Sequence, residues 1–366
     1  MFLKRRLSLI LSMIIVLSLV ISSVSASPVM SVLDKTDKSV TVKDILDREV
    51  TVKSPVEKIV VLDAHQQVTS ALEAMGAYDK IVGVDVDTSK EKLLFPNIGQ
   101  KDFVGTKDEL DLEEILKLDP DVVFDVGTFL GDEVKQMEDV GLPVVAVSLY
   151  PNPDDHFDPT IENTRVIGTI VGTEKTANEF ADWKEKYLNI IKERVATIPE
   201  DKKVTSLYTY RWTNSTLSSS GLKNRFHSAL DFIGTSDVNN DLDVDWAVID
   251  LEDILMKNPQ FIVFEEMNHM SGYDVSDTSA MEKDLTAVRS LPGLNTVDAV
   301  KNNKVYGLPS VLISGDTWLA AIYLAPVIYP DLFKDFDPVK IHQEYVDRYL
   351  KLNMDISDDT FIYPKP

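Results

Sequence analysis

Three residues that stand side by side, Tyr210-Arg211-Trp212, have the chemistry to hold a ligand. A guanidinium can donate two parallel hydrogen bonds to carboxylate or catecholate oxygens, and an indole ring offers a flat apolar wall. The segment therefore predicts one side of a binding pocket. The alternative is a surface arginine stacked on a half-exposed tryptophan. Trp246 presents a similar choice between lining the pocket and filling a core.

Two histidines follow apolar runs and are candidates for ligand contact. His65 comes with Gln66 shortly after the run IVVL, and His269 comes with Asn268 after the run FIVF. Each histidine is predicted to donate to a ligand or, as the alternative, to be a hydrogen-bonded structural residue. Metal ligation by both histidines would require them to face each other, which the sequence does not establish.

Glu265 and Glu266 offer the acid and base of an enzyme, with His269 as a further candidate. No G-x-S-x-G, H-E-x-x-H, G-x-G-x-x-G or Walker sequence stands beside them. The chain also has no cysteine, which excludes thiol catalysis, disulfides and cysteine zinc sites. We therefore expect a protein that is not an enzyme and has no cofactor, and an exported enzyme is the less favoured alternative.

A repeated segment must position these side chains. DLEEILKLDPDVVFD begins at Asp111, and DLEDILMKNPQFIVF begins at Asp250. Each aspartate is predicted to cap a short helix that Pro120 or Pro259 ends, because proline disfavours helical geometry in the preceding residue. The apolar run that follows is typical of a strand buried on both faces. A helix that leads into a buried strand, used twice, predicts two similar α/β lobes.

Alternating strands and helices predict mostly parallel sheets in both lobes. Between the lobes, heptad-like apolar spacing predicts two helices or one long kinked helix. The expected boundaries are a signal peptide or membrane anchor at 1–26, a linker at 27–39, an N-terminal lobe at 40–159, a bridging helix at 160–199, a C-terminal lobe with a terminal helix at 200–352 and a tail at 353–366.

Open α/β sheets bind ligands beyond the carboxyl ends of their strands, so the loops after the predicted strands are candidate binding segments. Together they offer aromatic walls, one guanidinium and several polar groups, as expected of a pocket for a large and partly apolar chelate. The predicted ligand-binding residues are His65, Gln66, Gly127, Thr128, Phe129, Tyr210, Arg211, Trp212, Trp246, Glu266, Asn268, His269 and Ser310.

Charge and the N-terminal segment restrict the possible partners. The net charge of −23 over 366 residues repels nucleic acid and anionic lipid surfaces, so no nucleic-acid partner is expected. The start of the chain combines Lys4-Arg5-Arg6, an apolar stretch and Val24-Ser25-Ala26, as in a secretory signal. The alternative is an uncleaved anchor over residues 7–24. Both alternatives predict an exported chain that meets the membrane only through this anchor or a membrane partner.

The ordered set of segments resembles one family. KIVVLDAHQQVTSALEAMGAYDKIVGVD is followed by PNIG, DLEEILKLDPDVVF, GLPVVAV, DWAVIDLEDILMKNPQFIVF and LPGLNTVDAVKNNKVYGLPS. The set is similar to the helical-backbone class of ABC-importer substrate-binding proteins, which serve ferric siderophores, haem and cobalamin, and it covers about residues 40–352. The resemblance implies two Rossmann-like lobes joined by one rigid helix, a ligand in the cleft between them, and delivery to an ABC permease and its ATPase without catalysis.

The resemblance also assigns two glutamates and ranks the ligands. One glutamate on each lobe pairs with arginines of the permease in this family, and by position these are Glu91 and Glu252. The alternative for Glu252 is an acid favoured by the helix dipole, which also explains Glu113 in the first repeat. Arg211 favours a ferric siderophore. Cobalamin comes second, because Val126 stands where cobalamin-binding relatives have a tryptophan, and haem comes third.

Overall fold

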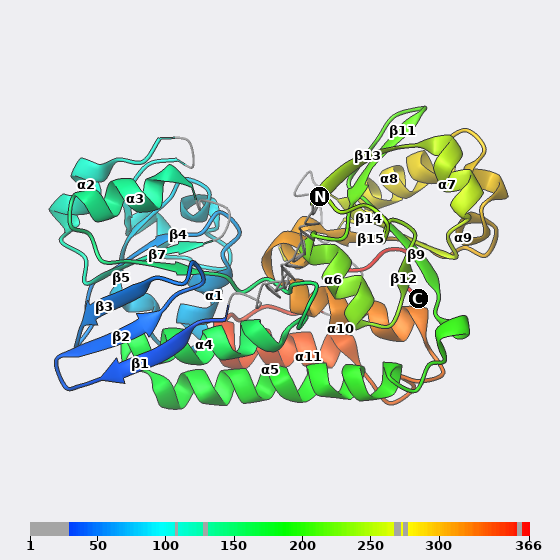
Figure 1. Ribbon diagram of the computed structural model, residues 1–366. Coiled ribbons are helices and arrows are strands. Elements are labelled where there is room, and N and C mark those ends of the chain that lie inside the picture. The colour runs from blue at the N-terminus through cyan, green and yellow to red at the C-terminus, as the bar shows by residue number, and fades with distance from the viewer. Residues whose placement is uncertain (1–28, 107–108, 127–130, 267–271, 274–276, 357–360) are drawn as a thin grey trace, which may run out of the picture.

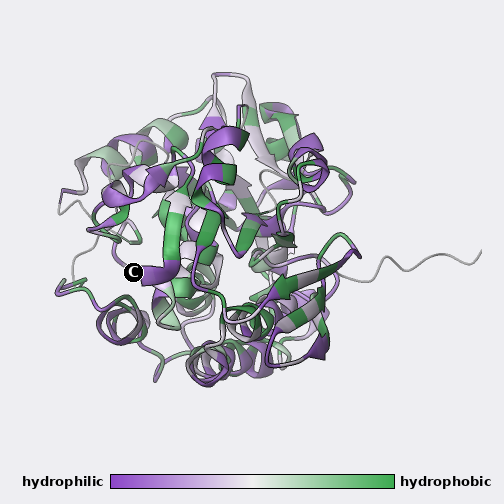
Figure 2. Cartoon of the chain, turned by 90° about the vertical axis from the view of Figure 1, so that its left-hand side faces the viewer, coloured by the Kyte–Doolittle hydropathy of each residue, from purple (hydrophilic) through white to green (hydrophobic). Residues whose placement is uncertain are grey.

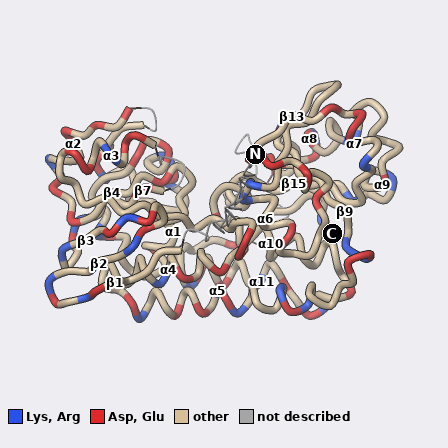
Figure 3. The backbone as a smooth tube through the Cα atoms, in the orientation of Figure 1, with Lys and Arg blue, Asp and Glu red and all other residues tan. Residues whose placement is uncertain are grey.

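The computed structural model has two lobes that lie side by side above one long helix (Figure 1). Hydrophobic strands occupy the centre of the N-terminal lobe (Figure 2), and acidic residues are spread along the chain over both lobes and the long helix (Figure 3). Within the described residues, no helix is long and apolar enough to cross a membrane. The structure describes residues 29–106, 109–126, 131–266, 272–273, 277–356 and 361–366.

A parallel sheet organises the N-terminal lobe. Three of its strands, β4, β7 and β8, are buried along their whole length, as their uninterrupted apolar runs predict. Helices α1 (Gln67–Ala74), α2 (Leu112–Leu118) and α3 (Asp132–Asp139) connect successive strands. Across the described part of this lobe, the strand order is β6 (Asp102–Phe103), β5 (Ile81–Val84), β4 (Ile59–Leu62), β7 (Val122–Val126) and β8 (Val144–Val147).

The C-terminal lobe repeats this plan and adds an antiparallel sheet. Across the described part of its parallel sheet, the strand order is β12 (Ser236–Asp237), β9 (Thr205–Thr209), β14 (Phe261–Glu266) and β15 (Val305–Pro309). The antiparallel sheet contains β10 (Arg211–Trp212), β11 (Thr216–Ser220) and β13 (Trp246–Asp250). The helices are α6 (Arg225–Phe232), α7 (Leu251–Lys257), α8 (Ser279–Arg289), α9 (Asp298–Lys301), α10 (Thr317–Ile328) and α11 (Pro338–Glu344). The predicted class of two α/β lobes with mostly parallel sheets is confirmed.

The two repeat copies occupy equivalent places in their lobes. In each copy a short helix, α2 or α7, leads into an inner strand of the parallel sheet, β7 or β14. The residues before the prolines, Asp119 and Asn258, both adopt left-handed backbone with φ of 52° and 46°. The predicted cap holds only in the first copy, where Asp111 accepts a hydrogen bond from the Glu114 amide at 2.9 Å. Asp250 ends strand β13 and makes no capping side-chain bond.

The predicted linker at 27–39 is wrong over its second half. Residues Ser31–Lys35 form strand β1, which pairs with β2 (Ser39–Lys43), and β2 pairs with β3 (Glu49–Lys53). The Met30 amide also donates to Asn163 at 2.7 Å, which ties this strand to the following helical layer. β1 is exposed along its whole length. Its sequence therefore does not need the apolar alternation that marks a half-buried strand, and the strand was not predicted for this reason.

The predicted bridge at 160–199 consists of two helices rather than one. α4 (Asp158–Val171) ends at Gly172, whose φ of 76° reverses the chain, and α5 (Glu174–Val195) runs back beside it. Arg165 on α4 forms ion pairs with Asp182 and Glu185 on α5. At 1.5 Å per residue, the 22 residues of α5 span about 33 Å, and this helix alone passes under both lobes (Figure 1).

The residues expected to be a tail, 353–366, pack onto the C-terminal lobe over their described part. The amides and carbonyls of Tyr363 and Gly307 exchange two hydrogen bonds, so the chain end extends the sheet beside β15. The Phe361 ring is buried and lies 4.5 Å from the ring of His342. These residues were missed because their apolar run, Phe361-Ile362-Tyr363, is only three residues long and follows a polar stretch.

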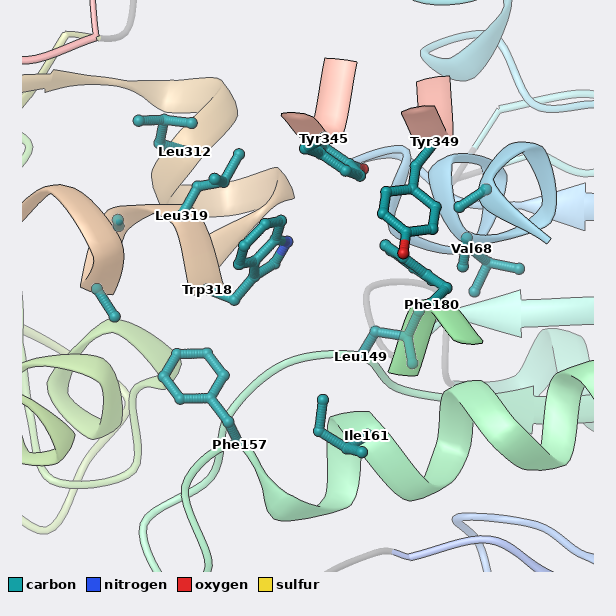
Figure 4. Close-up of a cluster of buried hydrophobic side chains, with 14 of the residues drawn as sticks. Val68, Leu149, Phe157, Ile161, Phe180, Leu312, Trp318, Leu319, Tyr345 and Tyr349 are labelled. Carbon is teal, nitrogen blue, oxygen red and sulfur yellow. The ribbon is translucent and has the colours of Figure 1, made fainter. Parts of the chain in front are cut away.

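An aromatic cluster fixes α5 to the rest of the molecule (Figure 4). On α5, Trp183 stacks on Phe180 and packs edge-on against Trp318 at the start of α10, with a Trp183–Trp318 ring distance of 5.4 Å. A π-helical turn over residues Tyr345–Leu350, which follows α11, adds Tyr345 and Tyr349. The cluster contains side chains from the bridge, the C-terminal lobe and the terminal helix.

We predict that Gly168→Ala destabilises the protein. A Cβ atom at residue 168 of α4 would lie 2.1 Å from the Cβ of Ala177 on α5, so the two helices would have to separate. We expect the free energy of unfolding to fall by about 1–3 kcal/mol, although alanine is the better helix former. Chemical denaturation measures the change. The double variant Gly168→Ala, Ala177→Gly should recover most of the loss, and strictly additive effects of the two changes would contradict the proposed contact.

Candidate functional site

A cavity of about 620 Å³ lies in the C-terminal lobe, beside the carboxyl ends of two parallel strands. The segment after β9 forms one wall, through the β10–β11 hairpin. The end of β14 and helix α8 form the other. Its lining residues are Tyr210, Arg211, Trp212, Thr213, Thr216, Ser218, Glu265 and Asp284. The cavity is therefore at the strand edge where the sequence places a binding site.

The predicted Tyr210-Arg211-Trp212 segment forms the wall on the hairpin. Arg211 is exposed, and its guanidinium lies 5.5 Å from the centre of the Tyr210 ring. Trp212 is half-buried and packs edge-on against Phe264, with ring centres 6.1 Å apart. Within the described residues Arg211 makes no ion pair, so its charge is available to a ligand that enters the cavity.

The predicted Trp246 packs behind this wall. Its ring centre is 4.7 Å from that of Tyr210 and 6.2 Å from that of Tyr208, and 40% of the residue is exposed. β13 brings it there, because Trp246 pairs with Ser220 of β11 in the antiparallel sheet. The structure thus places Trp246 next to the cavity and not in a core.

Glu265 marks the inner end of the cavity. Ser310 donates a hydrogen bond to its Oε1 at 2.6 Å, and Tyr208 donates to its Oε2. The carboxyl group is 4% exposed, and this burial raises its pKa. The predicted residue Ser310 thus holds Glu265, and the predicted residue Glu266, which is fully buried, is outside the cavity lining.

Arg225 connects the two lobes. It is the first residue of α6, and its Nη2 donates to the Ser314 hydroxyl at 3.2 Å. Its guanidinium also lies 4.3 Å from the ring centre of Tyr150, which follows β8 in the N-terminal lobe. No sequence signal indicated this pairing, because the two residues approach only when both lobes are folded.

On the N-terminal side, two buried aspartates shape the loop that carries His65. The Asp63 amide donates to Asp85 at 2.8 Å, and the amide and hydroxyl of Thr69 donate to Asp63. His65 then lies edge-on to Tyr150, with ring centres 6.5 Å apart. The loop thus brings one predicted ligand residue beside the contact between the lobes.

The neighbouring glutamines differ in their contacts. Gln66 has left-handed backbone with a φ of 58°, and its side chain donates to the Ala64 carbonyl of its own loop. The Gln67 side chain donates to the Gly315 carbonyl of the C-terminal lobe at 3.0 Å. The sequence analysis chose Gln66, whereas Gln67 makes the contact between the lobes, because the tight turn at Gln66 changes the direction of the side chains.

Five predicted ligand residues lie outside the described residues: Gly127, Thr128, Phe129, Asn268 and His269. Among the residues that are described, no group of three or more histidine, aspartate or glutamate side chains is arranged to hold a metal ion. The described geometry is that of a cavity with aromatic walls, one free guanidinium and buried carboxyl groups.

Comparison with known proteins places the chain in a family. The family model described as "Periplasmic binding protein" matches residues 59–312. The chain belongs to the periplasmic binding protein family. This membership confirms the resemblance to ABC-importer substrate-binding proteins.

Several members of the family resemble the chain over most of its length. An uncharacterized ABC transporter substrate-binding lipoprotein of Bacillus subtilis is 26% identical over 82% of this chain and 86% of its own. The molybdate-binding protein MolA of Haemophilus influenzae is 25% identical over 92% and 96%. A TroA-like periplasmic binding protein from Veillonella parvula has the same fold, with a TM-score of 0.73, 21% identity and coverage of 88% and 98%. The names of these family members describe binding and transport, in agreement with the expected absence of catalysis.

The family's glutamate positions are described in this chain. Glu252 is exposed in the first turn of α7, and Glu91 is half-buried just after a short 3₁₀ turn that follows β5. α2 and α7 lie on the same side of the molecule, opposite α5 (Figure 1). Glu113, at the equivalent place on α2, is also exposed.

We predict that Asp63→Asn changes how stability depends on pH. Burial raises the pKa of Asp63 from 3.8 to about 7, so the folded state keeps a proton that the unfolded state has lost between these values. Wild-type stability should therefore fall as the pH rises from 4 to 7. The asparagine variant should escape this loss, which amounts to about 4 kcal/mol at most.

Denaturant midpoints measured for both proteins at pH 4.5 and pH 8 test this expectation. The difference in unfolding free energy should favour the variant more at pH 8 than at pH 4.5. A difference that is the same at both pH values would contradict the raised pKa.

Proposed function

We propose that this periplasmic binding protein captures an iron chelate, a ferric siderophore, outside the cytoplasmic membrane and delivers it to an ABC permease and its ATPase. The observation that carries the proposal is the 620 Å³ cavity, whose described lining includes Tyr210, Trp212 and Arg211, an arginine with no ion pair among the described residues. Pockets of 300–1,000 Å³ suit ligands of this size. The guanidinium would hold chelating oxygens, and Tyr210 and Trp212 would contact the organic shell.

Molybdate is the second candidate, supported by the similarity to the Haemophilus influenzae protein. A tetrahedral oxyanion is far smaller than this cavity, and tight binding of such an ion would need several converging donors. The described lining offers one guanidinium and two carboxyl groups, and carboxylates repel an oxyanion. Cobalamin and haem remain alternatives of suitable size, served by the same route of capture and delivery.

Ligand titration followed by tryptophan fluorescence distinguishes these candidates, because Trp212 and Trp246 flank the cavity. The panel contains a ferric hydroxamate, a ferric catecholate, cobalamin, haem and molybdate. Saturable quenching by one ferric siderophore, with the siderophore recovered unchanged, is expected. Tight binding of only cobalamin, haem or molybdate would overturn the iron-chelate proposal, and a chemically altered product would support an enzyme.

We predict that Arg211→Ala weakens chelate binding by 10-fold to 100-fold, because a hydrogen bond to a charged group contributes about 1.5–3 kcal/mol. Lys223→Ala is the matched control, since this lysine of the same lobe pairs with Asp243 at the surface and is outside the lining. Isothermal titration calorimetry measures both variants. Equal affinities for the wild type and Arg211→Ala would remove Arg211 from the site.

We also propose that Glu91 and Glu252 dock the protein onto arginines of the permease. Charge reversal in Glu91→Arg or Glu252→Arg should leave ligand affinity unchanged and reduce stimulation of the transporter ATPase in reconstituted vesicles. Glu113→Arg is the control, because Glu113 is equally exposed on the matching helix and has no docking role in the family. If Glu113→Arg lowers stimulation while Glu91→Arg does not, the docking residue of the N-terminal lobe is Glu113.

A further inference from the structure

The charges that line the cavity do not suit a purely anionic ligand. Among the residues that the structure describes, the lining contains one guanidinium, Arg211 on β10, and two carboxyl groups, Glu265 at the end of β14 and Asp284 on α8. They come from three elements, so the packing of the whole lobe sets the arrangement. A ligand that fills this space meets one positive wall and one wall rich in carboxyl groups.

Glu265 is fixed in place by neutral hydroxyl groups. Ser310 and Tyr208 each donate their single proton to one of its oxygens, so the carboxyl group cannot turn away from the cavity. Neither donor carries a positive charge. Within the described residues Glu265 has no ion pair. The guanidinium of Arg225 is near enough to oppose the raised pKa of Glu265, but it donates its hydrogen bond to Ser314. Among the described residues, a buried carboxylate held this way has no cation in direct contact, and a ligand can supply one.

Asp284 adds to this negative wall. It is half-buried in α8, and it makes no ion pair within the described part of the chain. Burial and the neighbouring carboxyl group of Glu266 raise its pKa, so the surroundings resist a further negative charge there. A positive group on the ligand would relieve this repulsion and gain a charge-assisted hydrogen bond.

We propose that the cavity selects a ferric chelate that carries a protonated amine, with the iron-binding oxygens on Arg211 and the amine against Glu265 and Asp284. This inference rests on the proposed function and makes it more specific. It also corrects the simple expectation that Arg211 alone favours an anionic siderophore. A tricatecholate, whose ferric complex carries several negative charges, would meet two carboxyl groups and one guanidinium.

The test compares two ligands that differ only in the amine. Ferrioxamine B is a linear ferric trihydroxamate with one free amine, and its N-acetylated form lacks that positive charge. The wild-type protein should bind the free amine at least 10-fold more tightly than the acetylated form. Glu265→Gln and Asp284→Asn should each reduce this ratio towards one, mainly by weakening binding of the amine.

The controls distinguish this inference from the proposed function itself. Asp284→Asn changes a half-buried residue, so it remains informative if Glu265→Gln fails to fold. Asp243→Asn changes a surface acid of the same lobe that pairs with Lys223, and it should leave the ratio unchanged. Equal affinity for both hydroxamates, or tight binding of a ferric tricatecholate alone, would overturn the amine inference and leave the iron-chelate function intact. Binding of no ferric chelate would overturn both.

Discussion

The attachment of the bridging helix α5 to the C-terminal lobe depends on one buried lysine and the aromatic rings around it. Lys184 of α5 is 4% exposed, and its ammonium group lies 5.3 Å from the Phe180 ring and 5.4 Å from the Trp318 ring. Burial lowers its pKa to about 8, and the nearby carboxyl group of Asp316 opposes this shift. Asp316 in turn accepts hydrogen bonds from Trp318 and Tyr345. A buried charge is tolerated only with such partners, so these contacts must form together.

This arrangement explains how a cavity in one lobe is kept beside the other lobe. Asp316 follows directly after Gly315, whose carbonyl accepts the bond from Gln67 of the N-terminal lobe. Ser314, one residue earlier, accepts from Arg225, which contacts Tyr150. The segment after β15 therefore contacts the bridging helix, the opposite lobe and the end of the cavity within a few residues. Lobe closure would have to break several of these contacts at once.

Much of the architecture was predictable because buried parallel strands and their connecting helices leave strong local signals. The apolar runs around Val60, Val123 and Val263, and the prolines that end α2 and α7, indicate the elements and the repeat. Strand β1 of the antiparallel sheet β1–β2–β3 was not predicted, since it is exposed and has no apolar alternation. The turn at Gly172 was ambiguous, because a glycine inside a helical pattern can either be tolerated or reverse the chain.

The candidate site was predictable only where neighbours in sequence are also neighbours in space. Tyr210, Arg211 and Trp212 line the cavity together because a short hairpin carries them. Asp284 was missed, because it reaches the cavity from a helix whose facing depends on the packing of the lobe. The contacts of Gln67 and Arg225 were missed for a related reason. Their partners lie in the other lobe or in distant segments, and local patterns contain no information on such pairings.

The pairing of Tyr363 with Gly307 affects the order in which the molecule can assemble. A ribosome makes the chain from its N-terminus, so the N-terminal parallel sheet is complete while the last hundred residues are still missing. The C-terminal lobe instead needs the final residues of the chain to finish its sheet edge, and the aromatic cluster needs Tyr345 and Tyr349. Assembly of the two-lobe unit is therefore the last folding event, and a truncated chain would expose the aromatic face of α5 to solvent and to aggregation.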